Sequence, residues 1–181
     1  MSAPKLVILD RDGVINADSD EYIKSVEEWI PLPGSLAAIA RLKQAGWTVA
    51  VATNQSGIAR GLFPESVFHA MHDELQQRLA ALGACIDYVA FCPHAPDDAC
   101  ACRKPRPGLY QEIAQHFGCD LRQVPVVGDS RRDLEAAVAV GARPILVTTG
   151  KGMRSLRAGP LPLGSQVFVD LSSAVDALLS R

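Results

Sequence analysis

The sequence predicts an α/β protein in which a mainly parallel sheet lies between layers of helices. Short apolar runs alternate with amphipathic helical patterns along the whole chain. The apolar runs are continuous rather than interrupted by polar residues at every second position, which is typical of strands covered on both faces. Strand and helix in alternation indicate parallel strands joined by right-handed crossovers.

The elements follow one another in a regular order. The apolar runs predicted as strands are residues 5–10, 47–53, 86–92, 124–128 and 142–149. The helical patterns between and after them cover residues 34–46, 64–83, 130–141 and 172–181. The segment 151–165 is rich in Gly, Pro and basic residues, and we expect it to be a surface loop.

The second of these helices, residues 64–83, shows how its boundaries and its buried face are predicted. It begins with a proline and ends with a glycine, which are typical at these two ends of a helix. Apolar residues recur at helical spacing and predict one buried face. They are Val67, Met71, Leu75, Leu79 and Leu82.

The overall composition limits the classes of function. A chain of 181 residues is long enough for one domain, residues 1–181, with a substantial core. A net charge of -2 gives no basic field for nucleic acid, and no apolar run approaches the length of a membrane span. The odd number of cysteines, 5, and the lack of a signal sequence argue against disulfides. We expect a cytoplasmic monomer that binds neither nucleic acid nor membranes.

Three polar clusters stand at the ends of predicted strands. They are Asp10 to Asp12, Thr53 to Ser56, and Gly128 to Asp133. The carboxyl ends of parallel strands meet at one edge of the sheet, where α/β proteins bind their ligands. We therefore expect the three clusters to form one site.

The aspartates of these clusters could bind a cation. Asp10, Asp12 and Asp129 could present carboxylates to Mg²⁺, which prefers a few such ligands together with phosphate oxygens. An isolated Asp-x-Asp is more often a capped turn with one solvated carboxylate, so the interpretation depends on the other clusters. Asp133 could orient a ligand or Lys104, or could be an ordinary first-turn aspartate of a helix.

Other polar residues could hold a phosphoryl group. The hydroxyl of Thr53 and the amide of Asn54 can donate hydrogen bonds to phosphate oxygens, although a polar turn at a strand end would look the same. Arg103 and Lys104 are cations suited to phosphate, or they lie in a solvated basic loop.

Four motifs together, "DRDGVIN", "TNQSG", "RKP" and "VGDSRRD", resemble those of the haloacid dehalogenase superfamily of phosphotransferases. The resemblance implies a three-layer Rossmann-like fold, here without a large cap domain. It implies that Asp10 is the nucleophile, that Asp12 is the general acid and base, and that Thr53 and Lys104 stabilise the phosphoryl group. Catalytic Mg²⁺ would bind the side chains of Asp10 and Asp129 and the backbone carbonyl of Asp12.

A second metal is predicted in the loop 92–102. Cys92, His94, Cys100 and Cys102 are four soft ligands within a short segment, which suits a closed structural Zn²⁺ site. The alternative, buried cysteines beside a surface histidine, fits poorly with a segment that also contains two prolines and two aspartates. Cys85 and Cys119 are expected to be lone core thiols.

The zinc loop is similar to that of the branch of the superfamily that acts on heptose bisphosphate or histidinol phosphate. Ser56 stands where the histidinol members have Asp, and Arg103 and Arg60 could bind a second phosphate. We therefore expect removal of the C7 phosphate of D-glycero-D-manno-heptose 1,7-bisphosphate, within ADP-heptose synthesis for lipopolysaccharide. The alternatives are a histidinol-phosphate phosphatase and a non-enzymatic, receiver-like phosphate-binding module. The residues expected to bind the substrate are Asp18, Tyr22, Asn54, Gln55, Ser56, Arg60 and Arg103.

Overall fold

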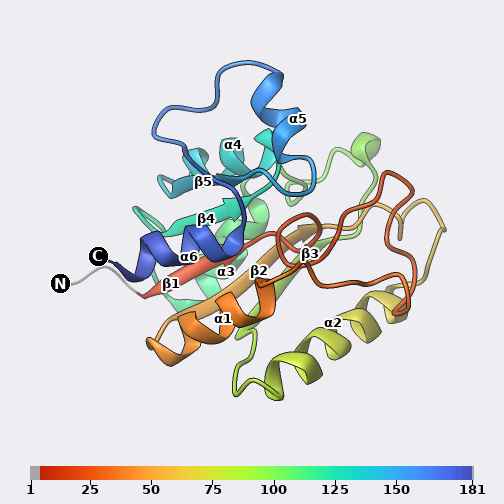
Figure 1. Cartoon of the computed structure of the whole chain (residues 1–181). Coiled ribbons are helices and arrows are strands. Elements are labelled where there is room, and N and C mark those ends of the chain that lie inside the picture. The colour runs from red at the N-terminus through yellow and green to blue at the C-terminus, as the bar shows by residue number, and fades with distance from the viewer. Residues whose placement is uncertain (1–4, 181) are drawn as a thin grey trace.

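A computed structural model describes residues 5–180, in which a parallel sheet is covered on both faces by helices (Figure 1). The strands are β1 (Leu6–Leu9), β2 (Thr48–Asn54), β3 (Tyr88–Cys92), β4 (Pro125–Gly128), β5 (Arg143–Val147) and β6 (Gln166–Phe168). The sheet order is β3-β2-β1-β4-β5-β6, and each neighbouring pair is parallel. This confirms the predicted three-layer α/β fold, and no large cap is present among the described residues.

Two helical layers enclose the sheet. The helices are α1 (Ser35–Gln44), α2 (Glu65–Ala80), α3 (Gly108–Phe117), α4 (Arg131–Ala139), α5 (Gly152–Arg157) and α6 (Leu171–Leu179), with a 3-10 turn η1 (Pro96–Asp98). Helices α1, α2 and α6 pack on one face, and α3 and α4 on the other (Figure 1). Strand β1 contributes to both cores, since Val7 and Leu9 face the first layer while Leu6 and Ile8 face the second.

The order of the strands in the sheet determines where the predicted site residues lie. The chain leaves β1 between β2 and β4, so the segments that follow these three central strands emerge side by side at one edge. Those segments contain Asp10, Thr53 and Asp129, as the sequence predicts.

The structure corrects several expectations. The segment 151–165 is not only a loop, because it contains helix α5, and β6 follows it directly. Helix α3 and strand β6 were not predicted; α3 is a short helix preceded by two prolines, which give it the appearance of a loop. Both elements are stabilised mainly by packing against the rest of the sheet rather than by their own sequence.

Two predictions of burial were also wrong. On α2, Phe68 takes the fully buried position rather than Val67, and Leu82 lies beyond the helix with 44% of its surface exposed. Cys85 is exposed rather than a core thiol, because its neighbours Ala84 and Ile86 face inward. Cys119 is only partly buried.

Candidate active site

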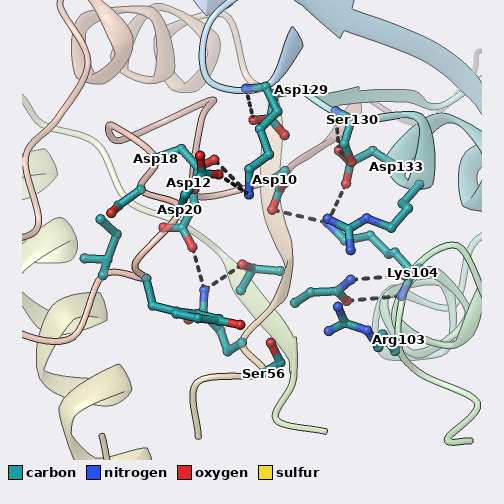
Figure 2. A pocket seen from close by; sticks show the side chains of 18 of the residues that line it. Asp10, Asp12, Asp18, Asp20, Ser56, Arg103, Lys104, Asp129, Ser130 and Asp133 are labelled. Carbon is teal, nitrogen blue, oxygen red and sulfur yellow. Dashed lines mark hydrogen bonds and ion pairs between the residues drawn. The ribbon is translucent and has the colours of Figure 1, made fainter. Parts of the chain in front are cut away.

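A cavity of about 310 Å³ opens at the carboxyl edge of the sheet (Figure 2). It brings together every residue that the sequence predicts for catalysis, substrate binding and Mg²⁺ binding. These are Asp10, Asp12, Asp18, Tyr22, Thr53, Asn54, Gln55, Ser56, Arg60, Arg103, Lys104 and Asp129.

Asp10 and Asp129 form the acidic floor of the cavity. Asp10 Oδ1 accepts a hydrogen bond of 2.7 Å from the backbone N–H of Arg11, and Asp129 Oδ2 accepts one of 2.8 Å from that of Lys151. Burial raises the pKa of Asp10 to about 7, an effect that Lys104 opposes, and burial together with Asp10 raises the pKa of Asp129 to about 8. Two carboxylates crowded and desolvated in this way are suited to bind a cation.

Asp133 belongs to the same cluster by distance but has other partners. One carboxylate oxygen from each of Asp10, Asp129 and Asp133 lies within 4.8 Å of the others. Asp133 Oδ2 accepts hydrogen bonds from the backbone N–H and the hydroxyl of Ser130, and Oδ1 pairs with Lys104. Asp10 and Asp129 are therefore the better candidates for Mg²⁺, and the residues present fit that ion.

Glycines allow the chain to approach Asp129 closely. A Cβ atom on Gly13 would lie 2.0 Å from Asp129 Oδ2, and one on Gly150 would lie 2.3 Å from it. Gly13 also has a φ of +83°, which favours glycine. The glycine of "DRDG" thus makes room for a carboxylate that comes from another strand.

The ammonium group of Lys104 is held at three acceptors. It lies 2.7 Å from the carbonyl oxygen of Ala52, 3.2 Å from Asp10 Oδ1 and 2.6 Å from Asp133 Oδ1. Burial alone would lower the pKa of Lys104, but Asp10 and Asp133 outweigh it and raise the pKa. Lys104 is therefore a fixed cation beside Asp10, and not part of a solvated basic loop.

Asn54 lines the cavity and also holds the backbone of Lys104. Its amide donates to the backbone carbonyl of Lys104 at 3.1 Å and accepts from the backbone N–H of Lys104 at 3.1 Å. Asn54 thus links the end of β2 to the loop that carries the lysine.

Gln55 joins two functional groups. Its amide nitrogen lies 2.9 Å from Asp12 Oδ2 and 2.9 Å from Thr53 Oγ1. Because Thr53 accepts this hydrogen bond, its own hydroxyl hydrogen can be donated to a phosphate oxygen. Ser56 lines the same wall of the cavity and is largely buried.

The rim of the cavity is strongly charged. Lys151 pairs with Asp18 at 3.2 Å, and the Arg60 guanidinium lies over the ring of Tyr22 at 5.8 Å. Burial lowers the pKa of Arg103, and the nearby charge of Arg132 lowers it further. Both arginines line the cavity, Arg103 half-buried and Arg132 exposed.

The four predicted zinc ligands meet at one point. The Cys92 sulfur lies 3.2 Å from that of Cys102 and 3.6 Å from that of Cys100, and His94 Nδ1 lies 3.3 Å from the Cys102 sulfur. These distances are too long for disulfides, and the cysteines are free. Four soft donors facing one another fit a closed tetrahedral Zn²⁺ site. Cys85 and Cys119 are not in the cluster.

Several lining residues were not predicted as part of the site. They are Ser19, Asp20, Ile23, Pro96 and Lys151. Ser130 and Arg132 lie within the predicted cluster Gly128 to Asp133 but were given no role, and Asp133 was left between two interpretations. Lys151 and Arg132 could have been found from the sequence, since each is a basic residue just beyond the end of a predicted strand. The partnership of Lys104 and Asp133 confirms that Asp133 orients a basic neighbour, while its bonds to Ser130 show that it also caps α4.

The fold and the site define a class of protein. Asp10 and a neighbouring carboxylate, a hydroxyl and a fixed lysine line one cavity at the carboxyl edge of a parallel sheet. These are the parts of a metal-dependent phosphoryl-transfer site. Two family models match the chain. One, described as "HAD-hyrolase-like", matches residues 101–174, and the other, described as "Polynucleotide kinase 3 phosphatase", matches residues 5–136.

Relatives that match nearly the full length of the chain define the class more narrowly. The D-glycero-beta-D-manno-heptose-1,7-bisphosphate 7-phosphatase of Bordetella bronchiseptica is 56% identical over 98% of this chain and 99% of the relative. The protein of the same name from Pseudomonas aeruginosa is 58% identical over 96% of this chain and 97% of the relative. The crystal structure of the B. bronchiseptica D,D-heptose 1,7-bisphosphate phosphatase, complexed with magnesium and phosphate, matches with a TM-score of 0.95 at 55% identity, covering 97% of this chain and 98% of that one. The chain belongs to the haloacid dehalogenase superfamily of phosphatases, in the family of these heptose bisphosphate phosphatases.

Proposed function

We propose that the protein hydrolyses the C7 phosphate ester of D-glycero-D-manno-heptose 1,7-bisphosphate, leaving the heptose 1-phosphate for the synthesis of ADP-heptose. The observation that carries this proposal is the cavity itself, with Asp10 and Lys104 at its floor and Arg103 and Arg132 also in its lining. The floor suits the phosphate that is cut, and the arginines suit a second one. The full-length relatives of the same name support the same substrate.

The first half of the reaction transfers the phosphoryl group to the protein. A carboxylate oxygen of Asp10 forms a bond to phosphorus while the bond from phosphorus to O7 of the heptose breaks. Asp12 gives its proton to the departing O7. Lys104 and the Thr53 hydroxyl face the charge on the phosphoryl oxygens and stabilise it.

The second half regenerates the carboxylate. Asp12, now ionised, removes a proton from water as the water oxygen attacks the phosphorus of the aspartyl-phosphate. The bond between phosphorus and Asp10 breaks, inorganic phosphate leaves, and Asp12 holds the proton for the next cycle. Mg²⁺, bound by Asp10, Asp129 and the Asp12 carbonyl, would neutralise phosphate charge throughout.

The metal of the cysteine loop has a structural part in this proposal. Four protein ligands leave no position for water on Zn²⁺, so it would not take part in the chemistry. Cys102 directly precedes Arg103 and Lys104, and the ion would fix the loop that places both cations. Thiolate ligands suit a reducing compartment such as the cytoplasm, and we propose that the protein works there as a monomer. In the described part of the chain, no helix is both long enough and apolar enough to cross a membrane.

The proposal is tested by measuring phosphate release from several substrates by the unaltered protein and by the Asp10→Asn protein. The unaltered protein should release one phosphate per molecule of heptose bisphosphate, with the C1 phosphate retained, and should act poorly on histidinol phosphate. Asp10→Asn should fold and bind substrate but release no phosphate, because an amide is a poor nucleophile. Faster turnover of histidinol phosphate, or an active Asp10→Asn protein free of deamidation, would contradict the proposal.

A further inference from the structure

Arg11 has the largest fully buried charged side chain among residues 5–180, and the mechanism above gives it no task. It lies between the two aspartates of "DRDG", yet only 1% of its surface is exposed. Burying a guanidinium is costly unless charged and hydrogen-bonding partners offset the cost. The partners of Arg11 therefore indicate what the residue does.

Arg11 makes a forked contact with Asp12. Its Nε donates to Asp12 Oδ1 at 3.0 Å, and its Nη2 lies 3.3 Å from Asp12 Oδ2. Two amides complete the enclosure, since Asn16 donates to Asp12 Oδ1 at 2.9 Å and Gln55 to Asp12 Oδ2 at 2.9 Å. Each carboxylate oxygen of Asp12 thus has an arginine donor and an amide donor, which fixes both its position and its orientation.

Apart from the contact with Asp12, the surroundings of the Arg11 guanidinium offer it few stabilising interactions. The guanidinium lies 5.4 Å from the centre of the Phe68 ring, in the apolar layer beneath α2. Its Nη1 is buried and has no hydrogen-bond partner among residues 5–180. An apolar side chain would pack against Phe68 without leaving a buried donor unpaired. Packing alone does not account for an arginine here, whereas the contact with Asp12 does.

The backbone of the same residue holds the other aspartate. The N–H of Arg11 donates to Asp10 Oδ1 at 2.7 Å, and its carbonyl accepts from the N–H of Ile15 at 2.8 Å, which closes the turn. One residue therefore contacts the proposed nucleophile through its main chain and the proposed acid and base through its side chain.

We propose that Arg11 is a positioning residue that aims the carboxylate of Asp12 for the second half of the reaction, in which it removes a proton from water. The inference rests on the role of Asp12 given above. Arg11 itself touches neither the substrate nor the phosphoryl group, since its side chain is buried behind Asp12. Its removal should lower kcat and leave KM nearly unchanged, because the carboxylate would remain in the site with a less favourable orientation.

A double-mutant cycle separates this role from a structural one. Arg11→Met keeps the volume beneath α2, and it should lower kcat for p-nitrophenyl phosphate about 10-fold or more, up to the loss of about 10²–10⁴ that follows when proton transfer is removed altogether. Asp12→Asn should by itself lower kcat within that same range. In the Asp12→Asn protein, adding Arg11→Met should change kcat by less than about twofold, because the group that Arg11 positions is gone.

Two further variants keep the test decisive. Arg11→Lys retains the charge but cannot form the two-point contact with Asp12. Its loss of kcat should be smaller than that of Arg11→Met and should also disappear in the Asp12→Asn protein. If the Arg11→Met protein does not fold, Arg11→Lys takes its place in the cycle. Phe68→Leu disturbs the same packing without touching Asp12 and should have the same effect with and without Asp12→Asn.

The outcomes are distinct. Equal losses on substitution of Arg11 in both backgrounds, or no loss in either, would overturn the positioning role. A fully active Asp12→Asn protein would instead overturn the proposed role of Asp12, and with it the basis of this inference. A loss that depends on the presence of Asp12, with unchanged KM, supports it.

Discussion

Lys104 Nζ lies 2.6 Å from Asp133 Oδ1, and the two side chains are 2% and 1% exposed. The lysine comes from the zinc loop and the aspartate from the first turn of α4, so the pair ties two separate segments to the floor of the cavity. The same ammonium group lies 3.2 Å from Asp10 (Figure 2). Asp133 therefore sets the position of the cation that faces the proposed nucleophile.

Asp133→Asn should both destabilise the protein and lower its activity. Breaking a buried pair by removing one partner costs about 3–5 kcal/mol, and the loss here should lie toward the lower end because Lys104 keeps its contact with Asp10 at 3.2 Å. Urea unfolding and kcat for p-nitrophenyl phosphate measure the two effects. Glu135→Gln is the control, since Glu135 makes only a long, exposed contact of 3.9 Å with Arg131 and its loss should cost less than about 1 kcal/mol. An Asp133→Asn protein as stable and active as Glu135→Gln would contradict the assignment.

Purified protein should contain about one zinc per chain, bound by the four ligands of the cysteine loop. Cys100→Ser should lose the zinc and much of the activity, since the segment that carries Lys104 would no longer be held in place. Cys85→Ser is the matched control, because Cys85 is exposed and outside the cluster. Elemental analysis of protein purified without chelators checks the content. Full activity in a zinc-free protein would exclude the structural role.

The sequence was sufficient for those parts of the site that lie next to one another in the chain or at strand ends. Continuous apolar runs identified the central strands. Asp10 and Asp129 directly follow β1 and β4, and Thr53 lies at the end of β2. The cluster of three cysteines and a histidine was predictable because its members lie close together in the sequence, from the end of β3 to Cys102. Helix α5 was missed because its glycine- and arginine-rich sequence has a weak helical pattern, and it is stabilised by its place beside Asp129.

Partnerships between distant residues were not predictable in the same way. Gln55 and Asn54 line the cavity, but their hydrogen bonds to Asp12 and to the backbone of Lys104 were not predicted. These contacts depend on the order in which β1, β2 and β3 lie in the sheet, which the strand patterns do not specify. The side chain of Arg11 gave no signal of burial, because an arginine between two aspartates looks like a solvated turn.

Mg²⁺ should stabilise the protein more at pH 8 than at pH 5.5. The pKa of Asp10 is raised to about 7 and that of Asp129 to about 8, both from an ordinary value of 3.8, chiefly by burial. In the unfolded chain both carboxyls lose their protons near pH 4. Stability from the protonated pair is therefore present at low pH and is lost as the pH rises through about 7 to 8.

The cation should reverse this loss, because it binds the ionised carboxylates and adds about 2.7 kcal/mol at 100 times its Kd. Thermal unfolding of dialysed protein with and without MgCl₂ measures the difference, with no chelator, so that zinc is retained. Asp129→Asn should reduce the gain from Mg²⁺. An equal gain at both pH values in the unaltered protein would show that these carboxylates do not bind the ion.

Arg103 should determine the preference for a substrate with a second phosphate. The phosphate that is cut would be held at the floor of the cavity, so discrimination depends on the other lining groups, which include Arg103 and Arg132. A hydrogen bond to a charged group contributes about 1.5–3 kcal/mol, or roughly 10- to 150-fold in specificity. Arg103→Ala should lower kcat/KM for the heptose bisphosphate by that factor and change kcat/KM for p-nitrophenyl phosphate much less.

Arg106→Ala is the matched control for this prediction, because it distinguishes recognition of the second phosphate from support of the zinc loop. Arg106 donates to the carbonyl of Cys100 within the loop but does not line the cavity, whereas Arg103 lines it and makes only a long contact of 3.5 Å with the carbonyl of His94. If Arg103 only supported the loop, Arg103→Ala and Arg106→Ala would both affect the two substrates equally. A loss confined to the bisphosphate, and to Arg103→Ala, would place the second phosphate beside Arg103. Equal losses on both substrates would remove that argument and leave the choice of a heptose bisphosphate to the relatives alone.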